Sequence, residues 1–332
     1  MAFIKALTYY LPKHIITNEE LEQQLAEVGG IGSVVKSMGV ELRHIVSEDE
    51  TASDMAVKAA EKLFQEYGIS SSEIDFVIFC TQSPDYFMPA TACLIQERLN
   101  IPNNAGAFDF DLGCSGYVYG LAIANSFIES GLAKNVLLLT GDTISKYLHK
   151  NDKNKALFGD AASATVISSS GFAEIGKFEL GTDGKGVDHI IVKNGACRNK
   201  ELTGGITCDE NDNIYYDDNF KMDGEAVFNF TIDRVPPLIE KTLSKNEISK
   251  EDVNYYVFHQ ANKFMLNTLR KISAIPKDDF FIDISDTGNT TSSSIPIALC
   301  KSLNNNKIEE NKKVMIAGFG VGLSWAGTIL KF

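Results

Sequence analysis

Residues 69–80 read ISSSEIDFVIFC, and residues 248–259 read ISKEDVNYYVFH. The two stretches align without a gap over twelve positions, at a constant offset of 179 residues. Each has a polar, serine-containing turn, an acidic residue and then an unbroken apolar run. A strand that is apolar on both faces is buried on both faces, as in the centre of a parallel or mixed sheet. The match therefore predicts that one structural unit occurs twice in the chain.

A second pair of stretches supports this internal repeat. The sequence NVLLL at 135–139 precedes KVMIA at 313–317 by 178 residues. Helical patterns lie between the predicted strands, at 19–28, 51–67, 90–99, 115–130 and 227–243. Buried strands that alternate with helices predict an α/β fold. We expect the chain to divide near Gly171 into two similar halves, 1–171 and 172–332.

Two segments are expected to depart from this regular pattern. Pro236 and Pro237 fall inside the helical pattern 227–243. A proline in a helix removes a hydrogen bond and crowds the preceding turn, so we expect a kink or break there. Residues 194–219 are rich in Asn, Asp and Gly and predict a long surface excursion, possibly with a hairpin.

Composition excludes several classes of protein. The chain has 332 residues, of which 44% are hydrophobic and 23% charged, which excludes a disordered tail or a coiled coil. A net charge of −13 disfavours nucleic-acid binding, because phosphate neutralisation needs clustered Lys and Arg. No apolar run is long enough to span a membrane, and the N-terminus lacks a signal-peptide pattern. The six cysteines form neither a C-x-x-C pair nor a zinc-like spacing with His. We therefore expect a cytoplasmic protein without a metal site.

Cys114 is the strongest candidate nucleophile. It lies in FDFDLGCSGYVYGL at 108–121, between a predicted strand and an apolar helix. The N-terminus of a helix carries unpaired N–H groups, which favour a thiolate over a thiol. The alternative is an inert buried cysteine, the interpretation that we give to Cys80, Cys93 and Cys300.

Two further polar residues follow predicted strands or turns in the second half. His259 ends the strand pattern 255–258, at the edge where α/β sheets present functional groups. Asn289 lies in DTGNTTSSSIPIAL at 286–299, a tight turn that leads into a helix. Taken singly, His259 could equally be an ordinary histidine at the edge of the core, and Asn289 an ordinary turn asparagine. The glycine-rich stretch AGFGVGLSWAG at 317–327 lacks the Lys-Ser/Thr of a phosphate loop and favours close backbone approach to an oxyanion.

Taken together, these segments resemble the β-ketoacyl-acyl-carrier-protein synthase III family of the thiolase superfamily. The resemblance runs along nearly the whole chain. It rests on GCSGY at 113–117, FGDAASA at 158–164, MDGEAVFNF at 222–230, HQAN at 259–262, GNTTSSSIPIAL at 288–299 and GFGVGLSWAG at 318–327. It implies the five-layered αβαβα thiolase fold, built from two duplicated halves, and a homodimer.

The resemblance also implies a reaction. Cys114 would attack an acyl thioester, carried by coenzyme A or by acyl-carrier protein, and hold the acyl group covalently. Malonyl-acyl-carrier protein would then lose carbon dioxide, and His259 and Asn289 would donate hydrogen bonds to the resulting enolate. Backbone amides of Cys114 and Val321 would hold the oxyanion of the tetrahedral intermediate. Phe87 and Met88 match the region that lines the acyl pocket, and no metal or organic cofactor is implied.

Positions that grip coenzyme A in the family depart from its pattern here. The family often has Arg where this chain has Ser37, and often has Arg where Phe264 follows HQAN. The basic residue expected before the FGD turn falls on Asp152. Lys36, Asn262 and Lys263 remain as possible contacts to coenzyme A or a carrier. These departures predict weak use of acetyl-CoA.

Four alternatives remain. A papain-like protease shares the order Cys, His, Asn, but the duplicated halves argue against it. A 3-hydroxy-3-methylglutaryl-CoA synthase needs a Glu, and 81–96 contains none. A non-catalytic subunit typically loses the Cys that this chain keeps. A synthase-III-like acyltransferase of a specialised pathway, with a non-acetyl donor or a non-malonyl acceptor, is the fourth.

Overall fold

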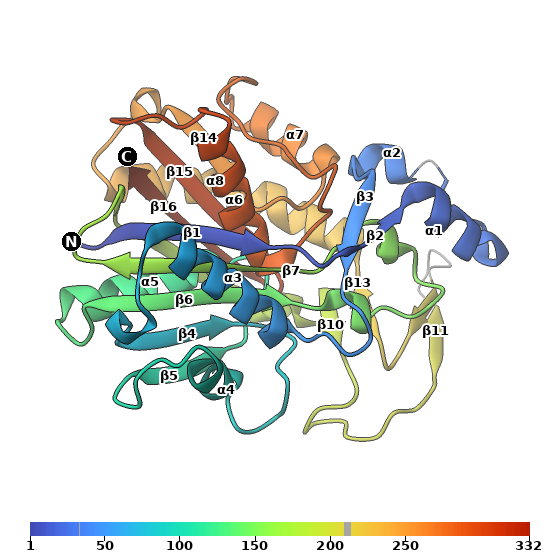
Figure 1. The fold of residues 1–332 in the computed structure, drawn as a ribbon. Coiled ribbons are helices and arrows are strands. Elements are labelled where there is room, and N and C mark those ends of the chain that lie inside the picture. Colours follow the sequence, from blue (N-terminus) through green and yellow to red (C-terminus); the bar gives the residue numbers. More distant parts are fainter. Residues whose placement is uncertain (33, 209–213) are drawn as a thin grey trace.

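The computed structural model describes residues 1–32, 34–208 and 214–332. The strands of the first half are β1 (Phe3–Tyr10), β4 (Phe76–Cys80), β5 (Gly106–Phe110), β6 (Asn135–Asp142) and β7 (Ala161–Ser168). They lie in the order β5–β4–β6–β7–β1. β4 is parallel to both of its neighbours, whereas β7 is antiparallel to β6 and β1 (Figure 1).

The second half repeats this order. Its strands are β14 (Tyr255–Phe258), β15 (Lys313–Gly320), β16 (Ser324–Lys331), β8 (Ala173–Ile175) and β9 (Glu179–Thr182). The order β14–β15–β16–β8 matches β4–β6–β7–β1, and a single parallel bridge from Phe280 to Tyr256 stands where β5 pairs with β4. The stretches that match in the sequence thus occupy equivalent strands, and the predicted duplication is confirmed. Because β8 pairs with both β1 and β16, the described strands of the two halves join into one continuous sheet.

Six helices complete five layers among the described residues. They are α3 (Ala52–Tyr67), α4 (Thr91–Arg98), α5 (Gly116–Glu129), α6 (Gly224–Lys245), α7 (Lys263–Ile272) and α8 (Ser294–Asn304). α3 and α4 cover the outer face of the first set of strands, and α6 and α7 cover that of the second. α5 and α8 lie between the two sets and pack on both. The αβαβα thiolase fold predicted from the sequence is confirmed.

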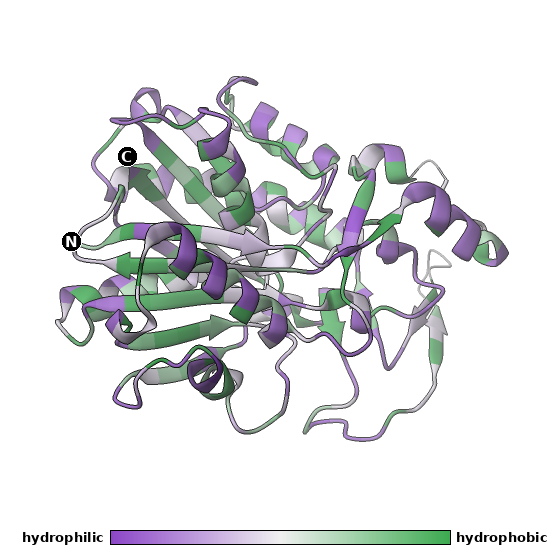
Figure 2. Ribbon diagram, viewed as in Figure 1, coloured by the Kyte–Doolittle hydropathy of each residue, from purple (hydrophilic) through white to green (hydrophobic). Residues whose placement is uncertain are grey.

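Hydropathy follows these layers. β6 and β7 are apolar along most of their lengths, whereas the outward side of α3 is hydrophilic (Figure 2). Every residue of β7 is buried, as expected for a strand with helices on both sides. No helix among the described residues has the length and apolar character needed to cross a bilayer.

The helix boundaries follow local capping chemistry. Thr51 caps α3, forms a capping box with Asp54, and Gly68 ends the helix in the left-handed conformation. The pattern 19–28 splits into α1 (Asn18–Gln24) and a single turn at Ala26–Val28. Its cap is Thr17 rather than Asn18.

Of the predicted kink or break at Pro236 and Pro237, the break does not occur. α6 runs through both prolines as one element. Val235, Leu238 and Ile239 are buried on the face that packs against β15 and β16. This packing stabilises the helix against the loss of two backbone donors.

Short elements gather at the end of the sheet to which β4 and β6 point (Figure 1). They comprise α1, α2 (Val34–Met38), β2 (His14–Thr17) with β3 (Leu42–Ile45), and β10 (Ile190–Val192) with β13 (Phe220–Met222). The surface excursion forms the expected hairpin, in which β11 (Ile206–Cys208) pairs with β12 (Ile214–Tyr216). These elements cover the carboxyl ends of the central strands, where α/β proteins place their functional groups.

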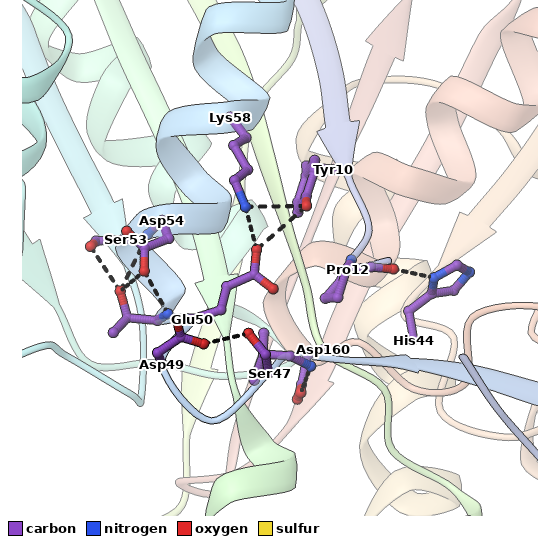
Figure 3. Close-up of polar contacts among 12 residues, drawn as sticks. Tyr10, Pro12, His44, Ser47, Asp49, Glu50, Ser53, Asp54, Lys58 and Asp160 are labelled. Atoms are coloured by element: carbon purple, nitrogen blue, oxygen red, sulfur yellow. Dashed lines mark hydrogen bonds and ion pairs between the residues drawn. The ribbon is translucent and has the colours of Figure 1, made fainter. Parts of the chain in front are cut away.

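The FGD turn at 158–160 holds these short elements against the sheet. The Asp160 carboxylate accepts hydrogen bonds from the backbone N–H of Val46 at 3.0 Å and of Ser145 at 3.1 Å. Figure 3 shows Asp160 beside the chain that runs from β3 to α3. Further along that segment, Glu50 accepts from Lys58 at 2.5 Å. Burial raises the pKa of Asp160 to about 6, and the hydrogen bonds from these donors act in the opposite direction.

Candidate active site

One cavity collects residues from both halves of the chain. Cys114 comes from the first half, and His259, Asn289 and the loop Phe319–Val321 come from the second. The rest of its wall is largely apolar and includes Ile144, Leu157, Phe158, Ile190, Phe220, Met222, Val227 and Met265. The structure therefore brings together the three polar residues that the sequence singled out, which are up to 175 positions apart.

Cys114 lies between β5 and α5, just before the helix cap Ser115. The Ser115 hydroxyl is 2.7 Å from that of Ser324, which fixes the turn against β16. A Cβ atom added to Gly320 would lie 2.9 Å from the Cys114 sulfur, and one added to Gly318 would lie 2.7 Å from its carbonyl oxygen. Glycine is thus required here because the backbone of β15 approaches the cysteine directly.

The resting Cys114 is a neutral thiol. Burial raises its pKa to about 12, and the nearby Asp142 carboxylate acts in the same direction. Hydrogen bonds from the backbone of Val321 and of Cys114 itself lower it. The expectation that the helix N-terminus would favour a thiolate is therefore wrong for the resting site, because desolvation outweighs the two backbone hydrogen bonds. The two backbone groups nevertheless lie beside the sulfur as hydrogen-bond donors.

His259 follows β14 and is only 1% exposed. Its Nδ1 lies 2.7 Å from the Ser294 hydroxyl at the start of α8. Burial lowers the pKa of His259 to about 3, and a hydrogen bond with the Thr291 backbone acts in the opposite direction. At neutral pH the imidazole is uncharged, so the resting site holds no thiolate–imidazolium pair of the papain type.

Asn289 presents its NH₂ group as a hydrogen-bond donor. Its Oδ1 accepts from the backbone N–H of Thr291 at 2.9 Å, so the two N–H bonds of the amide remain for the cavity. Its backbone is fixed by Leu157 and Gly159 of the opposite half, at 2.9 and 3.1 Å. Gly288 has a φ of +66°, and a Cβ there would lie 2.6 Å from the Leu157 carbonyl oxygen. Close contact between the halves therefore sets the position of Asn289.

The remaining predicted residues lie elsewhere. Phe87 and Met88 are 84% and 82% exposed, and neither is among the described residues that line the cavity of their own chain. Asn262 lines the cavity and caps α7 by accepting from Met265 N–H at 2.8 Å. Lys263 packs its stem against Gly39, and Lys36 is exposed on α2. Cys80 and Cys300 are buried as expected, whereas Cys93 is exposed.

A second hollow lies beside the cavity and shares Met222 and Gly224 with it. Its described lining also contains Asp152, Asp223 and Glu225, and one cation, Lys153. The described lining of this hollow is therefore net acidic.

Sequence reasoning missed the residues that hold the three polar groups in place. Ser294, Thr291 and Asp142 contact His259, Asn289 or their neighbours, yet each is an ordinary residue type in the sequence. The signal for Ser294 and Thr291 was their place in the Thr- and Ser-rich run after Asn289. Asp142 offered a weaker signal, as an acidic residue at the end of a predicted buried strand.

Comparisons with known proteins agree along the whole chain. A family model described as 3-oxoacyl-[acyl-carrier-protein (ACP)] synthase III matches residues 108–184, and the model of its C-terminal part matches 243–332. A β-ketoacyl-[acyl-carrier-protein] synthase III of Clostridium perfringens is 35% identical over 324 residues, which cover 97% of this chain and 96% of the relative.

Solved structures show the same relationship. A crystal structure of a 3-oxoacyl-(acyl-carrier-protein) synthase III is 41% identical, with a TM-score of 0.95 over 100% of this chain and 99% of the other. A 3-oxoacyl-(acyl-carrier protein) synthase of Burkholderia xenovorans has a TM-score of 0.90 at 35% identity, over 99% and 93% of the two chains. This chain accordingly belongs to the 3-oxoacyl-[acyl-carrier-protein] synthase III family of acyltransferases.

Proposed function

We propose that this chain is a β-ketoacyl-acyl-carrier-protein synthase III that initiates fatty acid biosynthesis. It loads an acyl group onto Cys114 and joins it to malonyl-acyl-carrier protein in a decarboxylative Claisen condensation. The observation that supports this most is the single cavity shared by Cys114, His259 and Asn289. The substrates are acyl thioesters, and the chemistry needs no further cofactor.

In the first step the Cys114 sulfur attacks the carbonyl carbon of the acyl thioester. The backbone N–H groups of Cys114 and Val321 hold the oxyanion of the tetrahedral intermediate. As the intermediate collapses, the old C–S bond breaks and the proton of the Cys114 thiol ends on the departing thiol. Because the Cys114 thiol has a pKa of about 12, it is not deprotonated before the attack. Its proton therefore leaves during the acyl transfer itself.

In the second step the malonyl carboxylate leaves as carbon dioxide. The electron pair of the broken C–C bond moves onto the thioester, whose oxygen becomes an enolate. His259 and Asn289 donate hydrogen bonds to that oxygen, and a neutral imidazole suffices because it carries one N–H. With Ser294 at Nδ1, we place the donated proton on Nε2. The enolate carbon then attacks the acyl carbonyl and forms the new C–C bond. The bond to the Cys114 sulfur breaks, and the released sulfur takes up a proton from water, which restores the neutral thiol.

The acidic hollow beside the cavity, which we propose as the route of the acyl donor, supports a choice of donor. Coenzyme A carries several phosphate charges, and the lost arginines at Ser37 and Phe264 would have bound phosphate bidentately. Two charge-assisted contacts at about 1.5–3 kcal/mol each correspond to roughly 100-fold or more in affinity. Asp152, Asp223 and Glu225 add repulsion, and Lys153 offsets it in part. We therefore assign the better donor to a carrier-bound or longer, apolar acyl chain, which also fits a specialised synthase.

The exposed loop around Phe87 and Met88 supports a homodimer. Tyr86, Phe87 and Met88 are consecutive large side chains that are at least 60% exposed. Such a run on one loop is a candidate for burial against another chain. We propose that Phe87 and Met88 close the acyl cavity of the partner subunit, in a cytoplasmic dimer whose protomers divide into halves 1–171 and 172–332.

The test is a reconstitution with purified protein, malonyl-acyl-carrier protein and a panel of acyl-CoA and acyl-carrier thioesters. We expect 3-oxoacyl-carrier protein by mass spectrometry, with carrier-bound or longer donors ahead of acetyl-CoA. If the protein uses micromolar acetyl-CoA efficiently and independently of salt, the donor assignment is wrong, whereas the proposed condensing activity stands. Absence of any condensation product, with peptidase activity in a parallel assay, would overturn the proposed function.

A further inference from the structure

A buried carboxylate connects the two halves directly behind the cavity. Asp142 ends β6 and is 1% exposed. Its Oδ1 accepts from the backbone N–H of Gln82 at 2.7 Å. Its Oδ2 accepts from the hydroxyls of Thr291 and Ser292, the latter at 2.7 Å. One side of this contact belongs to the first half and the other to the segment that follows Asn289.

Thr291 joins this carboxylate to the polar groups of the cavity. Its hydroxyl donates to Asp142, and its backbone N–H donates to Asn289 Oδ1 at 2.9 Å. Its backbone also hydrogen-bonds His259. Thr291 has a φ of +48°, a left-handed conformation that a β-branched residue adopts only when its surroundings enforce it. The hydroxyl bond to Asp142 is a contact that enforces it.

We propose that Asp142 is a positioning residue for decarboxylation, which acts through Thr291 to aim the Asn289 amide at the enolate oxygen. The inference rests on the proposed function of the cavity. Without the anchor, Thr291 relaxes towards a right-handed conformation and its N–H leaves Asn289 Oδ1. The amide is then free to rotate its oxygen towards the enolate, where it repels rather than stabilises negative charge.

The substitution Asp142→Asn separates the positioning role of Asp142 from a general structural role. The new amide oxygen can still accept from Gln82 N–H, but the new NH₂ would face two hydroxyls that now donate. Both hydroxyls must turn to accept, which removes the anchor of Thr291 at nearly constant volume. The same change removes a negative charge that raises the pKa of Cys114. Decarboxylation should therefore fall without a fall in acylation.

The experiment compares Asp142→Asn, Thr291→Val and Thr291→Ser with the unaltered protein. Carbon dioxide release from malonyl-acyl-carrier protein reports decarboxylation, and intact-protein mass spectrometry reports acylation of Cys114. We expect decarboxylation to fall roughly 10-fold or more in Asp142→Asn and Thr291→Val, as for a small misplacement of a reacting group. Thr291→Ser, which keeps the hydroxyl, should stay within about 3-fold, and acylation should be unchanged or faster in Asp142→Asn.

The outcomes are distinguishable. The positioning role is overturned if Thr291→Val decarboxylates at the normal rate. It is also overturned if the soluble variants lose both half-reactions equally. If Asp142→Asn does not fold, the comparison of Thr291→Val with Thr291→Ser decides. If the unaltered protein acylates Cys114 but releases no carbon dioxide from malonyl-acyl-carrier protein, the proposed function fails, and this inference falls with it.

Discussion

The Ser294 hydroxyl lies 2.7 Å from Nδ1 of His259, at the point where α8 begins beside the end of β14. The same hydroxyl oxygen lies 3.3 Å from the backbone N–H of Gln260, which donates to it. With that donor in place, the hydroxyl still has its own proton to offer to Nδ1. We propose that it donates there, which would favour the tautomer of His259 that carries its proton on Nε2.

Ser294→Ala should therefore weaken decarboxylation more than acylation. Loss of the hydroxyl leaves Nδ1 buried without this partner and allows the other tautomer, in which Nε2 cannot donate. We expect a loss of roughly 10-fold in decarboxylation, measured as carbon dioxide release. Nitrogen NMR of the imidazole gives the tautomer directly. Ser302→Ala, about two turns further along α8, is the matched control and should leave the His259 spectrum unchanged.

His259→Ala or Asn289→Ala should slow malonyl decarboxylation by roughly 100-fold or more, as the loss of one oxyanion donor does elsewhere. Transfer of the acyl group to Cys114 should suffer less, because no enolate forms in that step. The two rates are measured separately by carbon dioxide release and by intact-protein mass. An equal loss in both half-reactions would instead favour a papain-like site in which His259 activates the cysteine.

Gly320→Ala should block the nucleophile without unfolding the protein. The added methyl would lie 2.9 Å from both Cβ and Sγ of Cys114, so the cysteine or β15 must shift. We expect Cys114 acylation to fall roughly 10-fold or more, in line with the cost of a 1 Å misplacement. Gly184→Ala, where an added Cβ meets nothing within 4 Å, is the control and should acylate normally. Normal acylation in Gly320→Ala would show that the loop yields freely.

Alkylation of Cys114 should accelerate with pH over an unusually wide range. Burial raises its pKa to about 12, so the thiolate fraction increases about tenfold with each pH unit up to that value. Iodoacetamide labelling, followed at the Cys114 peptide from pH 7 to pH 10, should show no plateau. A plateau below pH 8 would mean that the helix N-terminus outweighs burial, as the sequence alone suggested.

The fold could be predicted from the sequence because burial on both faces leaves a continuous apolar run. Two such runs, now β4 and β14, fixed the duplication. The order of motifs likewise pointed to Cys114, His259 and Asn289, which the structure places on one cavity. Local patterns failed where tertiary packing decides. Buried side chains carry α6 through Pro236 and Pro237, and desolvation determines the charge state of Cys114.

The anchoring residues could not be predicted for a related reason. Asp142 and Thr291 are 149 positions apart and act only because the two halves meet face to face. Nothing in either local sequence marks a carboxylate that accepts from a threonine of the other half. In the proposed dimer, what the exposed Phe87 and Met88 cover is determined neither by their sequence nor by a single protomer.

The central claim is that Cys114 holds the acyl group, and peptide mapping tests it most directly. The protein is incubated with an acyl-carrier thioester, digested and mapped by mass spectrometry, beside Cys114→Ala, Cys80→Ala, Cys93→Ala and Cys300→Ala. We predict one acyl group on the peptide that contains Cys114, absent in Cys114→Ala and retained in the other three. An acyl group on a different cysteine, or an adduct that persists in Cys114→Ala, would contradict this assignment.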